Sequence, residues 1–413
     1  MALLAEGRLV SARTRLEAAL AGAHEPVARL AVLRTLLDVC LQARDDACVA
    51  RHGQAMVDPA ALAPAAAALG AELAREAAYY RDEGRLARGD PALTARILDG
   101  AAWRDENAYN GELYLRRQLL AARILAAQGR AAEASGALDK ALSLTASARN
   151  PEAAGVTVAQ TTAEAIRLLS ELGETERAWG LYRAAGADIA RLLPSPGADA
   201  AVFRLTEARL LQQMGELARS AEAAEAAFGA LEPLELEPAV RDRLRGEAVV
   251  LRASACAAAG RLDCARQALA AHPAAALHAT PGRRPADAGE LRYLALRSYL
   301  GAIAGEADAA AAQGLAAPLA FRPDPLAAAR LAIHRQAGAA LARPAGPARA
   351  SALAAAARAL AGGPATTGRP DALDRLLVSL LLAQADAGPE ADFALIQLAG
   401  RSGPVFDADA LAA

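Results

Sequence analysis

The sequence predicts an all-α fold, an α-solenoid (superhelix) of about ten antiparallel helical hairpins with a period of about 42–45 residues. Three observations lead to this prediction. The apolar residues are mostly alanine and leucine, turn glycines recur at nearly equal intervals, and no segment shows the alternation of β-branched and polar residues that is typical of a strand.

The composition suits closely packed helices better than one large core. Hydrophobic residues make up 54% of the 413 residues, but aromatic residues only 3%. Alanine is the strongest helix former because it loses no side-chain entropy on folding, yet it fills little volume. Each helix must therefore pack tightly on its neighbours to bury enough apolar area, as stacked hairpins do.

One pattern recurs along the chain: an apolar helix, a glycine-centred turn, and a second helix with small residues on one face. Examples are RILAAQGRAAEASGALDKAL and SACAAAGRLDCARQALAAHP. The predicted turn glycines, spaced 42–45 residues apart, are Gly84, Gly129, Gly173, Gly215, Gly260 and Gly305. Equal spacing of this length is typical of solenoid repeats. Weaker turns extend the series to Gly7, Arg44, Pro344 and Gly388.

The repeats also predict how the chain is organised. Helical repeats occupy 1–271, a Pro/Gly-rich loop 272–290, further repeats 291–390, and a closing helix with the start of a linker 391–413. Segment 272–290 is either a flexible loop or a boundary between two half-solenoids, and the loop is favoured.

The second helices resemble those of tetratricopeptide repeats (TPR), which carry an alanine, a large residue four positions on, and an alanine three further on. The matches are Ala134, Leu138 and Ala141; Ala178, Tyr182 and Ala185; and Ala12, Leu16 and Ala19. The chain departs from the family pattern at His272 and Gly314, and its period is longer. The resemblance implies a superhelix that binds a protein or peptide in a concave groove.

Carrying over the family's register places seven polar residues at groove-facing positions. They are Arg116, Arg123, Gln160, Arg167, Arg209, Gln212 and Gln213. The arginines would hold the carboxylates of an acidic or C-terminal peptide through forked hydrogen bonds. The alternative is that arginine, which is frequent in this chain, collects on a solvated helix face.

The sequence contains no motif that predicts catalysis, a metal or a cofactor. It has no phosphate-binding loop and no nucleophile elbow, and its five histidines are scattered. The formal net charge of −2 gives no bulk attraction to nucleic acid, and no apolar run is long enough to span a membrane. The N-terminus does not resemble a secretory signal, so the cytoplasm is the default location.

The four cysteines form two pairs with the same spacing. Cys40 and Cys48 lie four residues either side of Arg44, and Cys256 and Cys264 flank a later turn in the same way. This spacing places one thiol on each helix of a hairpin, within reach of a disulfide. Either the cysteines act as small apolar residues, or the hairpins contain disulfides, which would indicate an oxidising compartment.

The last segment, ADFALIQLAGRSGPVFDADALAA, resembles the region that joins TPR arrays to caspase-like CHAT domains in bacteria. The resemblance rests on Phe393, Leu395, Gln397, Leu398, Ala399 and Arg401. It implies that this chain is the recognition array of a larger protease. No His/Cys dyad in the family's context occurs here, so no catalytic residue is carried over.

The predicted function is a non-catalytic protein–protein interaction scaffold, serving as the sensor or substrate-docking array of a CHAT-type protease. Two alternatives stay open. One is an enzyme on a helical solenoid or toroid that uses Asp and Glu as acid and base, and the other is the ligand-sensing arm of a regulator. The sequence identifies neither the partner nor the oligomeric state.

Overall fold

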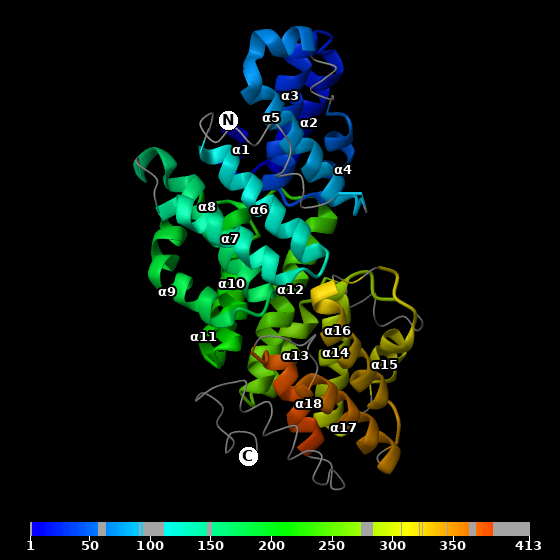
Figure 1. The fold of residues 1–413 in the computed structure, drawn as a ribbon. Helices are drawn as coiled ribbons and strands as arrows, with labels where there is room; N and C mark the ends of the chain where they lie inside the picture. The colour runs from blue at the N-terminus through cyan, green and yellow to red at the C-terminus, as the bar shows by residue number, and fades with distance from the viewer. Residues whose placement is uncertain are drawn as a thin grey trace. The chain divides into compact units, whose positions relative to one another are not determined.

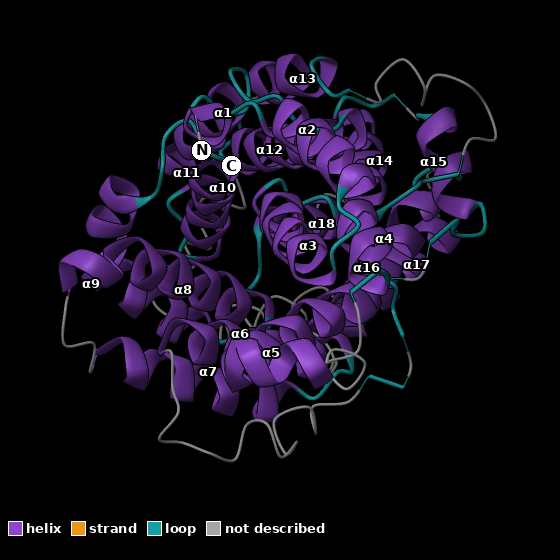
Figure 2. Cartoon of the chain, turned by 90° about the horizontal axis from the view of Figure 1, so that it is seen from above, coloured by secondary structure: helices purple, strands orange, loops and turns teal. Residues whose placement is uncertain are grey.

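The computed structural model describes residues 2–56, 63–90, 92–93, 111–146, 151–273, 284–306, 308–321, 323, 325–344, 346–362 and 369–382. Within these ranges it contains 18 α-helices and no β-strand (Figure 2). The predicted all-α class is therefore confirmed for the described part of the chain.

The described helices are labelled in chain order in Figure 1. They are α1 (Ala2–Ala5), α2 (Leu9–Gly22), α3 (Pro26–Gln42), α4 (Asp46–Gln54), α5 (Ala63–Ala87), α6 (Gly111–Ala127), α7 (Ala131–Ala146), α8 (Pro151–Glu171), α9 (Thr175–Leu192), α10 (Ala198–Gln213), α11 (Leu217–Ala230), α12 (Pro238–Ala258), α13 (Leu262–Ala270), α14 (Ala288–Ile303), α15 (Ala309–Ala316), α16 (Pro325–Ala340), α17 (Pro347–Gly362) and α18 (Ala372–Leu382).

The same turn joins the two helices of successive hairpins. Its central residue has a φ between 65° and 84° at seven glycines, which are Gly7, Gly89, Gly129, Gly173, Gly215, Gly260 and Gly305. The next N–H donates to the carbonyl five residues back, as from Arg130 to Leu125 (2.9 Å) and from Glu174 to Leu169 (2.8 Å). This is the Schellman arrangement, which satisfies carbonyls left open at a helix end.

Gly84, predicted as a turn, lies instead inside α5, and the turn follows at Gly89. Gly84 is a point of contact between α5 and α4, since a Cβ on it would lie 2.7 Å from the Cα of Gly53. The prediction was wrong because glycine serves both tight helix contacts and turns. Arg44, predicted at the second turn, does lie at a turn, with a φ of 54°.

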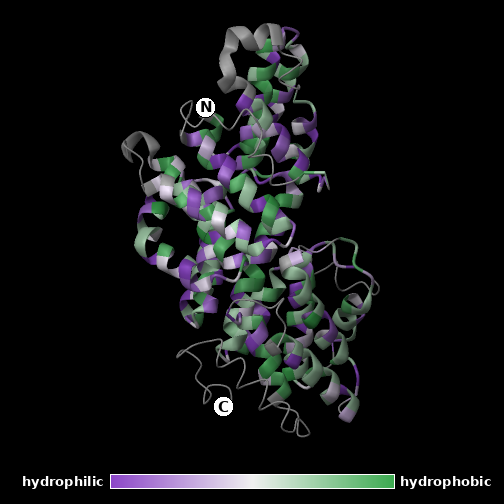
Figure 3. Ribbon diagram, in the orientation of Figure 1, coloured by the Kyte–Doolittle hydropathy of each residue, from purple (hydrophilic) through white to green (hydrophobic). Residues whose placement is uncertain are grey.

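The chain divides into two compact units, each with an apolar core of its own. The first unit comprises Met1–Leu168, Arg183–Phe203 and Ala230–Arg241, and the second comprises Leu169–Tyr182, Arg204–Gly229 and Asp242–Ala413. Helices α8, α9, α10, α11 and α12 therefore contribute residues to both units. Figure 3 shows apolar residues recurring along the described helices, as expected where every helix packs against its neighbours.

The first unit contains contacts that a simple solenoid does not make. The N–H of Val10 donates to the carbonyl of Glu235 at 3.2 Å, and the N–H of Glu235 donates to the carbonyl of Gly7 at 2.9 Å. Arg13 donates to Glu237, 224 residues away. Repeats of a solenoid contact only their neighbours. The packing of neighbouring helices is confirmed, whereas a simple solenoid is not.

Two predicted segments lie partly or wholly outside the described residues. Helix α13 ends at Ala270 and α14 begins at Ala288, so α14 starts within the predicted loop 272–290. Both flanks of this loop belong to the second unit. The closing helix and linker predicted at 391–413 lie outside the described part. Of the helices that the structure describes, none is both long and apolar enough to cross a lipid bilayer.

Candidate functional site

The leading candidate site is a cleft of about 190 Å³ in the first unit, called here the polar cleft. Side chains from α3, α4, α5, α6, α8 and α10 line it, together with the turn between α3 and α4. Three of the seven predicted groove residues, Arg116, Arg123 and Gln160, come together there. Its other charged residues include Asp38, Arg44, Glu83, Glu164 and Asp199.

Helical spacing explains why these side chains meet. Arg116 and Arg123 are seven residues apart on α6, and Gln160 and Glu164 are four residues apart on α8. Residues at these separations share one face of a helix. The helices therefore present charged faces to the polar cleft.

Arg123 forms the most buried ion pair of the cleft. Its Nη1 donates to both carboxylate oxygens of Glu83, at 2.8 and 3.0 Å. Glu83 is 2% exposed and also accepts the Tyr79 hydroxyl at 2.9 Å. Burial lowers the pKa of Arg123, but nearby carboxylates, led by Glu83, outweigh burial and raise the pKa. Arg123 therefore stays charged.

Arg44 ties the turn between α3 and α4 to α8 and α10. It donates to Asp199 at 2.8 Å and to Glu164 at 3.5 Å. Gln160 also donates to Asp199 (3.0 Å), and Arg167 donates to both oxygens of Glu164 (2.6 and 3.0 Å). Burial raises the pKa of Glu164, but Arg167 and Arg44 outweigh burial and hold the pKa well below its usual range.

Of the remaining predicted groove residues, Arg167 lies in the first unit, and Arg209, Gln212 and Gln213 lie in the second, where the two glutamines are interior. Gln212 and Gln213 are 0% and 5% exposed. Gln212 donates to the carbonyl of Leu251 at 2.7 Å, and Gln213 accepts the Ser170 hydroxyl at 3.1 Å. The prediction that these glutamines line a groove is therefore wrong. Their face of α10 lies against α8 and α12, where the amides satisfy buried polar groups.

Every predicted arginine already has a carboxylate partner within the protein. Arg116 donates to Asp38 and Glu112, at 3.0 and 2.8 Å. Arg209 is paired with Glu247 and lies 3.4 Å from Glu171. The predicted ladder is thus a set of internal ion pairs.

Arg123 differs from the other predicted arginines in how few of its donors are used. Only Nη1 takes part in its pair with Glu83, and neither Nη2 nor Nε has a hydrogen-bond partner among the described residues. The Arg123 side chain is 29% exposed. Arg123 can therefore donate further hydrogen bonds to a ligand that enters the polar cleft.

The structure contains two disulfides, Cys40–Cys48 and Cys256–Cys264. Their Cα atoms are 5.7 and 5.8 Å apart, within the usual range for a disulfide. Of the two interpretations open from the sequence, the structure supports the disulfide. Cys40 also lines the polar cleft.

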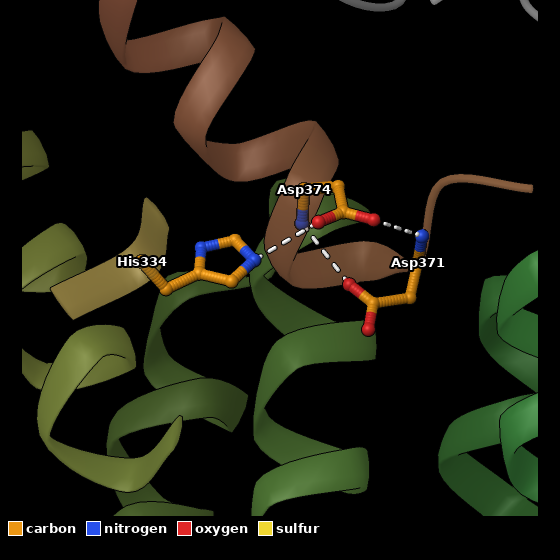
Figure 4. A group of neighbouring side chains, drawn as sticks. All are labelled: His334, Asp371 and Asp374. Carbon is orange, nitrogen blue, oxygen red and sulfur yellow. Dashed lines mark hydrogen bonds and ion pairs between the residues drawn. The ribbon is translucent and has the colours of Figure 1, made fainter. Parts of the chain in front are cut away.

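A second polar cluster lies buried in the second unit (Figure 4). His334 on α16 bonds Asp374 through Nε2 at 2.9 Å, and its Nδ1 lies 2.8 Å from the Tyr299 hydroxyl. Burial raises the pKa of Tyr299 well above its usual value, so the hydroxyl stays protonated and donates to His334. The imidazole thereby joins α14, α16 and α18.

The two aspartates of this cluster cap α18. Asp371 accepts the N–H groups of Leu373 and Asp374, at 2.9 and 3.1 Å, and Asp374 accepts the N–H of Asp371 at 2.8 Å. This is a reciprocal capping box. This capping box was not predicted from the sequence, although the segment RPDALD before an apolar run contains its signal.

The same cluster could offer a metal ion three ligands, because atoms of His334, Asp371 and Asp374 lie within 4.8 Å of one another. Its charges oppose that role. Arg292 donates to Asp371 at 2.5 Å, and Arg330 lies 3.6 Å from Asp374. A cation would have to replace the capping bonds and sit beside two guanidinium groups. The arrangement is that of a structural clamp.

Comparisons of this chain with protein-family models, curated proteins and solved structures find no match.

Proposed function

We propose that this chain is a non-catalytic, TPR-like interaction scaffold that binds an acidic side chain or the C-terminus of a protein in the polar cleft. The observation that carries the proposal is Arg123, which lines the cleft and uses only Nη1 on Glu83. A guanidinium has five N–H donors. Arg123 can therefore hold a ligand carboxylate through Nη2 and Nε while it keeps Glu83.

The surroundings of Arg123 support a preformed site. Ion pairs contributed by several helices fix its lining side chains, so binding orders few additional groups. A volume of about 190 Å³ suits one side chain or a chain terminus. The lining carries both signs of charge, whereas nucleic-acid sites are dominated by basic residues. The proposed ligand is therefore a protein or peptide, bound without a cofactor.

Fluorescence anisotropy with labelled peptides tests the proposal. The probes are a Glu-rich peptide with a free C-terminus and its counterpart with Gln for Glu and an amidated C-terminus. We expect the acidic peptide to bind preferentially. The combined variant Arg123→Gln and Glu83→Gln removes both charges without leaving either partner buried alone. Loss of a charge-assisted hydrogen bond should weaken binding about 10-fold to 100-fold.

A matched control is Arg130→Ala, because Arg130 pairs with the exposed Glu133 and does not line the cleft. Its affinity for the acidic peptide should equal that of the wild type. The proposal fails if the folded double variant binds as tightly as the wild type. It fails equally if the wild type does not discriminate between the two peptides.

We further propose that the array is the docking part of a bacterial CHAT-type protease. The residues that support this, 391–413, lie outside the described part of the structure. Sequencing the gene beyond codon 413 tests the proposal, since a continuing frame should encode a caspase-like domain and any other domain would contradict it. The cytoplasm is the location expected by default. Disulfides in cytoplasmic proteins are usually transient.

A further inference from the structure

The disulfide Cys40–Cys48 closes the turn that supplies one wall of the polar cleft. Cys40 lies in the last turn of α3 and Cys48 in the first turn of α4, and both residues are buried, at 1% and 2% exposure. Cys40 itself lines the cleft. The chain enclosed by the disulfide includes Arg44 and Asp45. Any change in this disulfide therefore acts directly on residues at the cleft.

Arg44 occupies a backbone conformation that the other turns of this type give to glycine. Its φ is 54°, a region disfavoured for residues with a Cβ. The side chain reaches Asp199 and Glu164, which lie 155 and 120 residues further along the chain. An outlier of this kind is retained where its side chain is needed. At this turn the side chain fixes the charges of the cleft.

Asp45 couples the turn to its surroundings in a second way. Its carboxylate caps α4 by accepting the N–H of Cys48 at 2.9 Å, and it also accepts a bond from Arg13 at 2.8 Å. The position of Cys48 is thus tied to the residue that follows Arg44. A shift of the first turn of α4 would therefore move Asp45 and, with it, Arg44.

The second disulfide, Cys256–Cys264, provides an internal comparison. It has the same separation of eight residues and lies at the Gly260 turn, which has a φ of 74°. A Cβ built on Gly260 would meet nothing within 4 Å. Gly260, at the position that Arg44 occupies in the first turn, contributes no side chain to a distant partner. The two disulfides differ chiefly in the residue at the centre of the turn they enclose. In the first it is Arg44, which lines the polar cleft, and in the second it is Gly260.

We propose that Cys40–Cys48 is a reversible redox modification site, and that its reduction releases Arg44 from Asp199 and Glu164 and so changes the charge that the polar cleft offers to a ligand. The inference goes beyond the proposed function, because it depends on the turn and its ion pairs and not on what the cleft binds. Two thiol sulfurs cannot remain at bonding distance, so reduction removes the covalent link between α3 and α4 and the two sulfurs must move apart at the turn.

The reaction requires a dithiol reductant. One thiolate of the dithiol attacks a sulfur of the disulfide, the S–S bond breaks, and a mixed disulfide forms. The second thiol of the reductant then displaces the protein sulfur and closes the reductant's own disulfide. Two electrons and two protons pass from the dithiol to the protein, which leaves Cys40 and Cys48 as thiols. The reductant leaves in oxidised form.

Hydrogen exchange measured by mass spectrometry on the full chain, with and without dithiothreitol, tests the proposal. A thiol titration on the same samples reports how many cysteines are free. On reduction we expect amides of 41–48 to exchange faster. Amides of α8 near Glu164 and of α10 near Asp199 should also exchange about fivefold faster or more, because Arg44 no longer links them to the turn.

Three variants separate this mechanism from general loosening. Cys40→Ala with Cys48→Ala should reproduce the reduced pattern without reductant. Arg44→Gly keeps the disulfide and introduces the glycine that the other turns have at this position. In this variant, reduction should accelerate the exchange of amides 41–48 alone. Cys256→Ala with Cys264→Ala should leave α8 near Glu164 unchanged. Wild-type exchange near Glu164 and Asp199 that does not respond to reduction would overturn the proposal, as would global unfolding of the reduced chain by circular dichroism.

Discussion

Glu164 shows at the scale of one residue how the polar cleft keeps a buried charge. Removing a carboxylate from water is unfavourable, and Glu164 is largely buried. Arg167 binds both of its oxygens and Arg44 binds one, so the attraction of two guanidinium groups offsets the loss of hydration. The pKa of Glu164 is consequently depressed. A single acidic residue thereby links the turn at Arg44 to α8.

This depressed pKa predicts a loss of stability in acid. Glutamate in an unfolded chain titrates near pH 4.3, and the folded pKa is lower, so the unfolded state takes up the proton first as the pH falls. The contribution of Glu164 is fully present above about pH 5 and is lost as the pH falls toward the folded pKa. Urea unfolding at pH 7 and pH 3.5 measures it. The free energy of unfolding that is lost between these two pH values should be about 1 kcal/mol smaller in Glu164→Gln than in the wild type.

The matched control for this measurement is Glu133→Gln, because Glu133 is exposed and pairs with Arg130 at the surface. The Glu133→Gln variant should lose as much free energy of unfolding between pH 7 and pH 3.5 as the wild type does. If Glu164→Gln loses as much stability in acid as the wild type, the pKa of Glu164 is not depressed by the arginines.

At the scale of the elements, the contact between α4 and α5 depends on two glycines. A Cβ on Gly53 would lie 2.6 Å from the Cα of Gly84, and one on Gly84 would lie 2.7 Å from the Cα of Gly53. Both distances are shorter than non-bonded carbon atoms tolerate. The helices therefore approach more closely here than any residue with a side chain would allow.

Gly84→Ala should accordingly destabilise the protein, although alanine favours a helix by about 1 kcal/mol. The added methyl group meets backbone that can move only if the helices separate, which we expect to give a net loss of about 1–3 kcal/mol. The control is Gly136→Ala in α7, where a Cβ meets nothing within 4 Å. That variant should gain about 0.5–1 kcal/mol. Urea unfolding that ranks the two variants equal would contradict the tight contact.

The sequence predicted the elements better than it predicted which face each element buries. The period located most turns because a positive φ requires glycine at the same point of each hairpin, and it located Arg44 by interval alone. It misplaced the turn at Gly84, where local residues do not reveal a helix contact. Arg116 and Arg123 line the polar cleft, whereas Gln212 is interior, since polarity does not show whether an amide faces solvent or a buried carbonyl.

At the scale of the whole chain, the difference from a simple repeat array lies in the first unit. Backbone bonds join Gly7 and Val10 to Glu235, and Arg13 bonds both Asp45 and Glu237. Nothing in the repeat pattern predicted these contacts, because the pattern describes only neighbours. Stability of this unit therefore includes interactions between segments distant in sequence, beyond the nearest-neighbour sum of a repeat protein.

Arg13 allows this long-range stabilisation to be measured. Arg13→Ala removes its bonds to Asp45 and Glu237, and we expect a loss of about 1–2 kcal/mol because Asp45 is buried. Hydrogen exchange should accelerate at the start of α4 and also at 234–241. Arg15→Ala is the control, since Arg15 is exposed on the same helix and forms no ion pair within the described residues. Faster exchange at α4 with no change at 234–241 would mean that α2 stabilises only its neighbours, as in a simple solenoid.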